Sequence, residues 1–254
     1  MSAGSEQRRV LVTGGGRGVG AAIVTALAGA GFAVDFTYRN SAEEAARLTE
    51  TLAASHPDVA IRARKLDLSN KTALEDFATE IEAETWFGLV HNAGQPYDAL
   101  TAMIAQDKAE AAMQVNFWSL TRLAKAVMRG MLRAREGRIV AIGSVAALQA
   151  NAGNAAYAAS KGALLSYCRT LAIETAKRGI AVNYVAPGFI DTEMMAGYAA
   201  HRPQMEKQIP AGRFARPQEI AALVGFLLTP PAAYITGAVL PVDGGLTAML
   251  GVHR

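Results

Sequence analysis

Short apolar runs alternate along the chain with longer segments in which apolar residues recur at helical spacing. Because expected strands and helices alternate, the pattern predicts an α/β fold with a seven-stranded, mostly parallel, doubly wound sheet. The strands are expected at Arg9–Val12, Ala33–Tyr38, Val59–Leu66, Leu89–His91, Arg138–Ile142, Ile180–Val185 and Val239–Val242. The helices are expected at Val19–Gly29, Ala42–Ala54, Lys71–Glu82, Asp107–Arg135, Ala155–Lys177 and Pro217–Leu228.

Local signals support several of these boundaries. Ser41 followed by Glu44 has the spacing of a capping box, which predicts a helix start. Gly31 and Gly179 stand where helices should end, because glycine readily adopts the left-handed conformation common there. Residues 188–210 show no clear periodicity, and long irregular segments in compact domains are usually lids or binding loops. We therefore expect a substrate lid at about 188–210.

Length and composition favour one folded unit. With 254 residues, of which 51% are hydrophobic, the chain can bury a full core, so residues 1–254 are expected to form a single domain. No window is apolar enough to span a membrane, and Met1–Arg9 lacks the apolar stretch of a secretory signal. A cytoplasmic protein without membrane insertion is expected.

Charge and ligand-forming residues argue against two further classes of protein. The formal net charge of +3 is too slight to indicate nucleic acid binding, and a mixed solvated surface explains it better. Cys168 is the only cysteine, so neither an intrachain disulfide nor a thiolate metal cage can form. No metal site is expected, because the histidines are scattered without ligand spacing, at His56, His91, His201 and His253.

A glycine cluster follows the first expected strand and opens the first helix. Glycine permits a tight turn and close approach of a ligand, and the free N–H groups of a helix N-terminus favour a phosphate. The spacing of Gly14, Gly18 and Gly20 therefore predicts a site for the pyrophosphate of a dinucleotide. A turn with only a structural role is the alternative, and the strand–turn–helix context argues against it.

Tyr157 and Lys161 are four residues apart in an expected helix, so they lie on one face. A phenol with a pKa near ~10 is a weak acid–base catalyst at neutral pH, but a nearby cation stabilises the phenolate and lowers that pKa. Lowering the pKa by about three units requires roughly 4 kcal/mol, which a partly desolvated pair can supply. The spacing occurs by chance on many helices, so the pair needs support from other residues.

Two polar residues elsewhere in the chain supply that support. Ser144 ends an apolar strand, where ligands bind in open α/β sheets, and its hydroxyl can donate to a carbonyl oxygen. Asn116 lies inside an otherwise apolar-faced helix, where a buried amide must find partners.

The segment Thr13–Gly20 resembles the Thr-Gly-x-x-x-Gly-x-Gly motif of the short-chain dehydrogenase/reductase family. The resemblance extends over nearly the whole chain and implies a Rossmann-type three-layer α/β/α sandwich, a single dinucleotide-binding catalytic domain. It also implies a catalytic tetrad of Asn116, Ser144, Tyr157 and Lys161, in which the tyrosine exchanges a proton with the substrate oxygen. In the family, the serine orients the carbonyl and the lysine lowers the tyrosine pKa and bonds the nicotinamide ribose. The asparagine kinks its helix and holds a water.

Residues after the second expected strand indicate which nicotinamide cofactor is used. In dinucleotide folds an acid there bonds the ribose of NAD, whereas a basic residue accommodates the 2′-phosphate of NADP. Tyr38 fills the acid's position, Arg39 follows it, and Arg17 precedes the second glycine of the motif. NADPH is therefore expected, although two surface arginines are the alternative. Asp35 comes too early in the strand and is assigned a structural role.

The resemblance implies further cofactor contacts after the third, fourth and sixth strands. Asp67–Leu68 resembles the adenine-contacting pair, Asn92–Gly94 the Asn-Asn-Ala-Gly motif, and Pro187–Thr192 the segment over the nicotinamide. His91 replaces the first Asn of its motif, and we expect this to change a sheet contact without touching the chemistry. The expected cofactor-binding residues are Gly14, Gly16, Arg17, Gly18, Val19, Gly20, Arg39, Asp67, Leu68, Asn92, Ala93, Gly94, Tyr157, Lys161, Pro187, Gly188, Ile190 and Thr192.

Within the family the chain is most similar to the 3-oxoacyl-(acyl-carrier-protein) reductases, in residues 137–144, 185–190, 209–213 and 233–237. This implies NADPH-dependent reduction of a 3-oxoacyl thioester to the 3-hydroxyacyl thioester, in fatty acid or related polyketide or aryl-polyene biosynthesis. One alternative is an NAD(P)-dependent dehydrogenase of a small alcohol or sugar. Another is a non-catalytic dinucleotide-binding sensor, against which the intact tetrad argues.

The resemblance also implies two kinds of partner. An acidic acyl carrier protein would present the substrate, and Arg129 matches one basic position that receives it in relatives. Ile173 stands where many relatives have another arginine, and Arg169 lies one helical turn earlier. The expected helices at 107–135 and 155–177 pack in a homotetramer in the family, and a helix covered by its own domain is the alternative.

Overall fold

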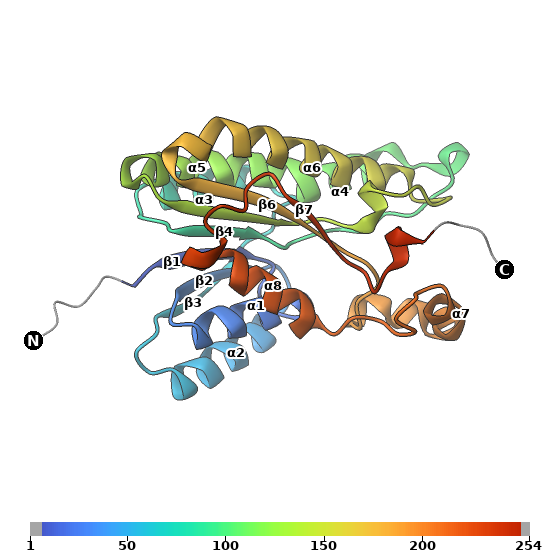
Figure 1. The fold of residues 1–254 in the computed structure, drawn as a ribbon, viewed down its shortest axis with the longest axis horizontal. Helices are drawn as coiled ribbons and strands as arrows, with labels where there is room; N and C mark the ends of the chain where they lie inside the picture. The colour runs from blue at the N-terminus through green and yellow to red at the C-terminus, as the bar shows by residue number, and fades with distance from the viewer. Residues whose placement is uncertain (1–6, 250–254) are drawn as a thin grey trace, which may run out of the picture.

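The computed structural model describes residues 7–249, and they form one seven-stranded sheet in the order β3-β2-β1-β4-β5-β6-β7 (Figure 1). All six strand pairs are parallel. The strand order reverses between β1 and β4, and in doubly wound sheets ligands bind at such a point. The strands are β1 Arg9–Thr13, β2 Ala33–Tyr38, β3 Ile61–Lys65, β4 Gly88–His91, β5 Gly137–Ile142, β6 Ile180–Pro187 and β7 Val239–Val242.

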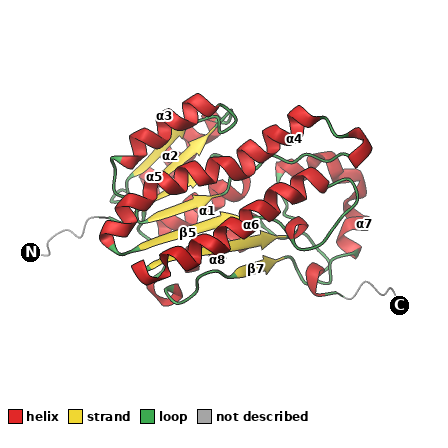
Figure 2. Cartoon of the chain, turned by 90° about the horizontal axis from the view of Figure 1, so that it is seen from above, coloured by secondary structure: helices red, strands yellow, loops and turns green. Residues whose placement is uncertain are grey.

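Helices cover both faces of the sheet, which confirms the predicted three-layer fold. On one face lie α1 (Gly18–Gly29), α2 (Ala42–Ser55) and α8 (Pro217–Leu227). On the other lie α3 (Lys71–Glu82), α4 (Gln106–Met113), α5 (Ser119–Ala134) and α6 (Ala155–Thr175). The short helix α7 (Arg202–Lys207) lies beyond the carboxyl ends of the strands, as the view from above shows (Figure 2).

Two apolar cores, one on each side of the sheet, result from the alternation of side chains along each strand. In β1, Leu11 faces the core under α3 and α5, whereas Val10 and Val12 face the core under α1 and α8. Both faces are buried, so the central strands read as almost continuous apolar runs rather than as alternating ones.

The helix predicted over 107–135 is interrupted by one turn of π-helix at Gln114–Trp118, between α4 and α5. A π turn inserts one residue per turn, so it releases backbone carbonyls from the regular ladder. The apolar spacing continues across the interruption, which is why the sequence predicted one helix. The turn contains Asn116, whose side chain is fully buried.

The segment predicted to be irregular is largely helical. A 3-10 helix covers Glu193–His201 and leads directly into α7, which has a proline in its first turn. These pieces are too short to show a periodicity of their own, so the prediction of an irregular stretch was wrong. A lid at residues 188–210 remains a prediction.

Helix boundaries agree with the glycine signals but not with the expected capping box. Gly31 and Gly179 have φ angles of +82° and +73°, as predicted for helix ends. Helix α2 does begin after Ser41, but the serine side chain forms no capping hydrogen bond. Its hydroxyl is instead beside the glycine loop, where a Cβ on Gly16 would lie 2.5 Å from Ser41 Oγ.

Two searches of the described residues concern membranes and metals. No helix within residues 7–249 is long and apolar enough to cross a membrane. In the same range, no group of three His, Cys, Asp or Glu side chains is arranged to hold a metal ion. His253 and most of the N-terminal segment Met1–Arg9 lie outside the described residues.

Candidate active site

The glycine loop between β1 and α1 has the conformation that a bound phosphate requires. Gly14 and Gly18 have φ angles of +67° and +54°, which favour glycine. A Cβ on Gly20 would lie 2.0 Å from the carbonyl oxygen of Gly14, so the helix approaches the turn too closely for any side chain. The Arg17 side chain does not cap α1, and the first turn of α1 contains no acidic residue. The helix N-terminus is therefore free to bind an anion.

Beside this loop, three side chains could bind the 2′-phosphate of NADP. Arg17 is largely exposed, and its guanidinium lies 3.4 Å from the carboxylate of Glu193. Arg39 is exposed at the end of β2. Ser41 was not among the predicted site residues, yet its hydroxyl lies against Gly16. Its position two residues after Arg39 was a usable signal, because hydroxyls commonly bind phosphate oxygens.

Asp67 and Leu68 follow β3, where an adenine contact was predicted. Burial acts to raise the pKa of Asp67. Hydrogen bonds from Ser69 and the positive charge of nearby Arg39 outweigh this effect and hold the pKa below its usual range. The Asp67 carboxylate accepts from the Ser69 backbone N–H at 2.9 Å and from its hydroxyl at 2.6 Å. The backbone carbonyl of Leu68 accepts from the side chain of Gln114 at 3.2 Å. The structure thus brings Asp67 close to Arg39 and joins Leu68 to the π turn.

The turn after β4 is tied to the glycine loop by hydrogen bonds. The side-chain amide of Asn92 donates to the carbonyls of Thr13 and Gly14 at 3.1 and 3.0 Å. The Thr13 hydroxyl accepts from the backbone N–H groups of Asn92 and Ala93 at 3.1 and 3.0 Å. The predicted residues of these two loops therefore form one continuous surface at the switch point of the sheet.

His91 alters a sheet contact, as expected, and also reaches the π turn that contains Asn116, so its effect on the chemistry is a matter for experiment. Its Nδ1 lies 3.1 Å from the Thr13 hydroxyl, and its Nε2 lies 3.3 Å from the backbone carbonyl of Asn116. Burial lowers the pKa of His91 to about 3, and the neighbouring Lys161 adds to the effect. A neutral His91 therefore joins Thr13 of β1 to the backbone of the π turn.

Asn116 is held by three further hydrogen bonds. Its amide group donates to the carbonyl of Gln95 at 3.0 Å and to the Ser160 hydroxyl at 2.8 Å. Its side-chain oxygen accepts from the backbone N–H of Gln95 at 2.7 Å. A Cβ on Gly94 would lie 3.3 Å from Lys161 Nζ and 3.6 Å from Asn116 Oδ1, so both groups border the same glycine.

Lys161 is buried and has no carboxylate partner among the described residues. Its ammonium donates to the carbonyl of Ile142 at 3.0 Å. Burial lowers the pKa of Lys161 to about 8. The Nζ atom lies 5.8 Å from the centre of the Tyr157 ring, which places the predicted pair side by side.

The pKa of Tyr157 differs from the sequence-based expectation. Burial raises it and the charge of Asp98 adds to the rise, whereas a hydrogen bond with the Ser144 hydroxyl opposes it. In this structure the Lys161 ammonium donates to the Ile142 carbonyl. The Ser144 hydroxyl also accepts from the Ala146 backbone N–H at 3.1 Å, which fixes its orientation beside Tyr157.

The segment after β6 returns to the glycine loop. A Cβ on Gly188 would lie 2.9 Å from the Asp243 side chain, so only glycine fits this exit from the sheet. Ile190 forms an isolated parallel bridge with Ala215. A Cβ on Gly18 would lie 3.6 Å from Thr192 Cγ2, which places Thr192 over the start of α1. The segment therefore borders the region in which a nicotinamide was predicted.

Together, the glycine loop, the Asn92–Gly94 turn and the four polar residues at the carboxyl ends of the strands define a dinucleotide-dependent oxidoreductase site. A family model described as enoyl-(acyl carrier protein) reductase matches residues 14–247. The chain belongs to this family of short-chain dehydrogenases/reductases.

Individual relatives indicate the reaction more specifically than the family model does. The chain is 43% identical to the 3-oxoacyl-(acyl-carrier-protein) reductase FabG of Pseudomonas aeruginosa, over 93% of this chain and 96% of that protein. It is 40% identical to FabG of Vibrio cholerae, over 95% and 98% of the two chains. The short-chain dehydrogenase/reductase from Serratia marcescens superposes with a TM-score of 0.88 at 35% identity, over 94% and 98% of the chains.

A further solved structure concerns the cofactor. A protein from Beutenbergia cavernae, provisionally described as an NAD(P)-dependent gluconate 5-dehydrogenase, was solved with bound NADP at low occupancy. It superposes with a TM-score of 0.90 at 32% identity and covers 95% of this chain and 97% of its own.

Proposed function

We propose that the protein reduces a 3-oxoacyl thioester to the 3-hydroxyacyl thioester with NADPH. The observation that carries the proposal is the convergence of Ser144, Tyr157, Lys161 and Asn116 beside the glycine loop, in a chain up to 43% identical to curated 3-oxoacyl-(acyl-carrier-protein) reductases. Two hydroxyl groups side by side are suited to one carbonyl oxygen on which negative charge develops.

The cofactor site fits a phosphorylated dinucleotide. When bound, NADPH supplies the hydride that is added to the carbonyl carbon. The free N-terminus of α1 would hold the pyrophosphate, and Arg17, Arg39 and Ser41 would hold the 2′-phosphate. Thr192, which lies over Gly18, would contact the nicotinamide end.

The chain's own residues would supply the proton. Ser144 donates a hydrogen bond to the substrate oxygen, and Tyr157 donates its proton to that oxygen as the alcohol forms. Lys161 provides a buried positive charge that stabilises the resulting phenolate. Asn116 keeps the turn at Gln95 and the Ser160 hydroxyl in place beside the lysine.

Replacement of Tyr157 by Phe tests the chemical assignment. Loss of the proton donor should lower kcat with acetoacetyl thioester and NADPH by about 100-fold to 10,000-fold, because general acid catalysis contributes this much. Tyr167→Phe is the matched control: this tyrosine lies on the same helix, packs against Phe117 and should retain full activity. Near-native turnover by the Tyr157 variant, with folding verified by circular dichroism, would reject the assignment.

The preference for NADPH is tested at the two residues that follow β2. Arg39→Ala should raise KM for NADPH about tenfold, because a charge-assisted phosphate contact contributes more than 1 kcal/mol. Ser41→Ala should raise it about threefold, since only a neutral hydrogen bond is lost. Neither change should affect KM for NADH, which lacks the 2′-phosphate. An equal rise for both cofactors would contradict this subsite.

A second candidate is a dehydrogenase of a small alcohol or sugar, which the likeness to the Beutenbergia cavernae protein favours. Turnover of NADPH with 3-oxoacyl thioesters is therefore compared with turnover of NAD and NADP with gluconate and short alcohols. An enoyl thioester belongs in the panel, because the matching family model is described as an enoyl reductase. The substrate with the highest kcat/KM decides between them.

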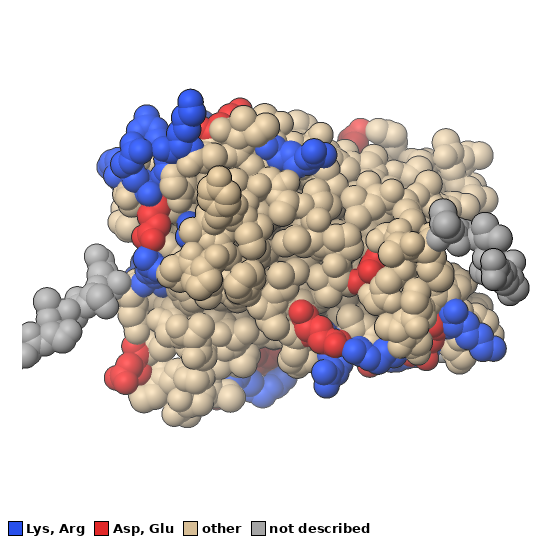
Figure 3. Space-filling view, viewed as in Figure 1, with Lys and Arg blue, Asp and Glu red and all other residues tan. Residues whose placement is uncertain are grey.

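An acyl carrier protein that presents the substrate is part of the proposal, with Arg129 as a candidate contact. Arg129 is exposed and pairs with Glu82 at 3.0 Å. Ile173, at a position where many relatives have an arginine, is also exposed. Lys and Arg side chains gather near the carboxyl ends of α5 and α6 (Figure 3). Arg129→Glu should raise KM for an acyl-carrier substrate and leave KM for an acyl-CoA unchanged.

A homotetramer in the cytoplasm is likewise proposed. Trp118 and Ile173, next to α5 and on α6, are 47% and 82% exposed, which leaves apolar surface for a second copy. Size-exclusion chromatography with light scattering tests the assembly, and the mass of a monomer would reject it.

A further inference from the structure

Tyr184 has no role in the proposed chemistry, yet it touches two of the residues that do. Its side chain in β6 is fully buried. Its hydroxyl accepts a hydrogen bond from the backbone N–H of Ser144 at 3.0 Å and donates to the backbone carbonyl of Lys161 at 3.2 Å. One phenol therefore joins the end of β5 to the second turn of α6.

The neighbouring glycine shows how closely Tyr184 fits. A Cβ on Gly143 would lie 1.7 Å from Tyr184 Cζ and 2.0 Å from its hydroxyl oxygen. The phenol thus occupies the space that a side chain just before Ser144 would fill. Gly143 also donates its N–H to the Val185 carbonyl at 2.7 Å, so β5 and β6 are held together on both sides of the ring.

We propose that Tyr184 is a positioning residue for the reduction, whose hydroxyl holds Ser144 against Tyr157 and fixes the turn of α6 that carries Lys161. In this role Tyr184 acts through the backbone groups of Ser144 and Lys161. Burial raises the pKa of Tyr184 far above its usual range, so the hydroxyl stays protonated and keeps donating at every working pH. The substrate side of this inference rests on the proposed function.

Tyr184→Phe removes the hydroxyl and keeps the ring. Because Ser144 and the α6 turn then lose their common partner, we expect kcat to fall about tenfold while KM for NADPH stays within twofold. Thr175→Val is the matched control: it removes another buried hydroxyl, one that donates to the Leu171 carbonyl in α6 at 2.8 Å, and it should leave kcat unchanged. A Tyr184→Phe enzyme with kcat within twofold of the parent overturns the proposal.

A double-mutant cycle tests whether the effect passes through Ser144. In a Ser144→Ala background the hydroxyl that Tyr184 helps to place is absent, so Tyr184→Phe should lower kcat by less than threefold there. The same tenfold loss in both backgrounds would show that the two residues act independently and would overturn the route through Ser144.

A substrate-free measurement separates this inference from the proposed function. The hydrogen bond from Ser144 lowers the pKa of Tyr157, so loosening it should raise the Tyr157 titration midpoint in ¹³C-tyrosine NMR spectra of the Tyr184→Phe protein. Tyr157→Phe identifies the signal. A parent enzyme that reduces no 3-oxoacyl thioester rejects the proposed function, whereas an unchanged Tyr157 titration in the variant rejects the role of Tyr184.

Discussion

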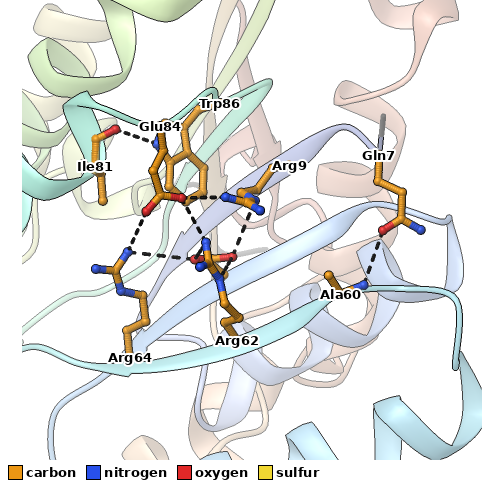
Figure 4. Close-up of polar contacts among 9 residues, drawn as sticks. Gln7, Arg9, Ala60, Arg62, Arg64, Ile81, Glu84 and Trp86 are labelled. Atoms are coloured by element: carbon orange, nitrogen blue, oxygen red, sulfur yellow. Dashed lines mark hydrogen bonds and ion pairs between the residues drawn. The ribbon is translucent and has the colours of Figure 1, made fainter. Parts of the chain in front are cut away.

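Two clusters of polar side chains lie toward opposite ends of the parallel strands, and each contains a buried charged group, Asp35 in one and Lys161 in the other. Near the amino ends, Asp35 and Glu84 are surrounded by Arg9, Arg62 and Arg64 (Figure 4). The guanidinium of Arg62 lies 2.9 Å from both carboxylates. At the carboxyl ends, Lys161 is buried with Asn116 and His91 beside the partly buried Tyr157, and its ammonium donates to the Ile142 carbonyl, its one hydrogen bond among the described residues.

Opposite charges are paired in the Asp35 cluster, whereas the Lys161 cluster contains a positive charge with no carboxylate partner among the described residues. A hydrogen bond to Asp35 raises the pKa of Arg62, so that charge is stabilised by its partner. Burial raises the pKa of Asp35 in spite of its arginines, of which Arg62 lies 2.9 Å away. Burial lowers the pKa of Lys161, which has no counter-ion within residues 7–249 to offset the desolvation. Compensated charge supports the fold, whereas uncompensated charge is available to a cofactor and a substrate.

Lys161→Met should produce the largest contrast, because it abolishes activity and stabilises the protein. We expect kcat to fall at least about 1,000-fold and the free energy of unfolding at pH 7 to rise by about 2 kcal/mol. The folded-state pKa of about 8 lies below the unfolded value of 10.5, so the parent gains stability as pH rises through this interval. Urea unfolding at pH 7 and pH 10 should show the two proteins converging.

A Lys161→Met protein that is no more stable than the parent at pH 7 would contradict an uncompensated charge. The cofactor supplies a second check, since an anionic dinucleotide should stabilise the parent more than the variant in thermal unfolding.

Asp35→Asn should affect stability and leave catalysis alone. Loss of one carboxylate leaves three arginines facing Glu84, so the free energy of unfolding at pH 7 should fall by about 2 kcal/mol. Because burial raises the pKa of Asp35 in the folded state, the parent should gain stability as pH falls through that raised pKa and the asparagine variant should not, so the difference between them should widen. Urea unfolding and kcat are measured together, and kcat should stay within twofold.

Glu43→Gln is the control for that experiment. Glu43 is 88% exposed and pairs with Arg47 one turn away in α2, so its loss should change the free energy of unfolding by less than about 0.5 kcal/mol. Equal losses from Asp35→Asn and Glu43→Gln would mean that the buried network contributes no more than a surface pair.

The contrast also explains which features the sequence could predict. The glycine loop and the Tyr157–Lys161 pair are local patterns, so their positions followed from spacing alone. The structural role of Asp35 followed from its place in mid-strand, and its three arginine neighbours confirm it. The orientation of Ser41 toward Gly16 was not predicted. A serine just before a helix can cap that helix or place its hydroxyl against a distant loop, and the spacing does not distinguish the two.

His91 escaped prediction for a related reason: its two ring nitrogens reach β1 and the π turn, which are far apart in sequence. A regular apolar spacing gave no sign of the π turn, so the backbone carbonyl that His91 contacts there could not be foreseen. The substitution relative to the family motif was visible, but its partner was not.

Among Lys161→Met, Asp35→Asn and His91→Leu, the last should change the free energy of unfolding least. It tests the link between His91 and the π turn. Leucine loses both hydrogen bonds, so kcat should fall about fivefold and the free energy of unfolding at pH 7 by about 1–2 kcal/mol, with KM nearly unchanged. His91→Gln keeps an N–H donor and an acceptor and should recover part of both losses. A Leu variant with the kcat of the parent would contradict the link to Asn116.

The acid side of the stability profile provides the second readout for His91. Its folded-state pKa of about 3 lies below the ordinary 6.5, so the unfolded chain binds a proton first and the parent loses stability as pH falls from 6.5 toward 3. The Leu and Gln variants lack this titration, so their unfolding free energies should decline less steeply over the same interval. Equal slopes in the parent and both variants would show that His91 is not held neutral, and the contrast with the compensated charges around Asp35 would then rest on Lys161 alone.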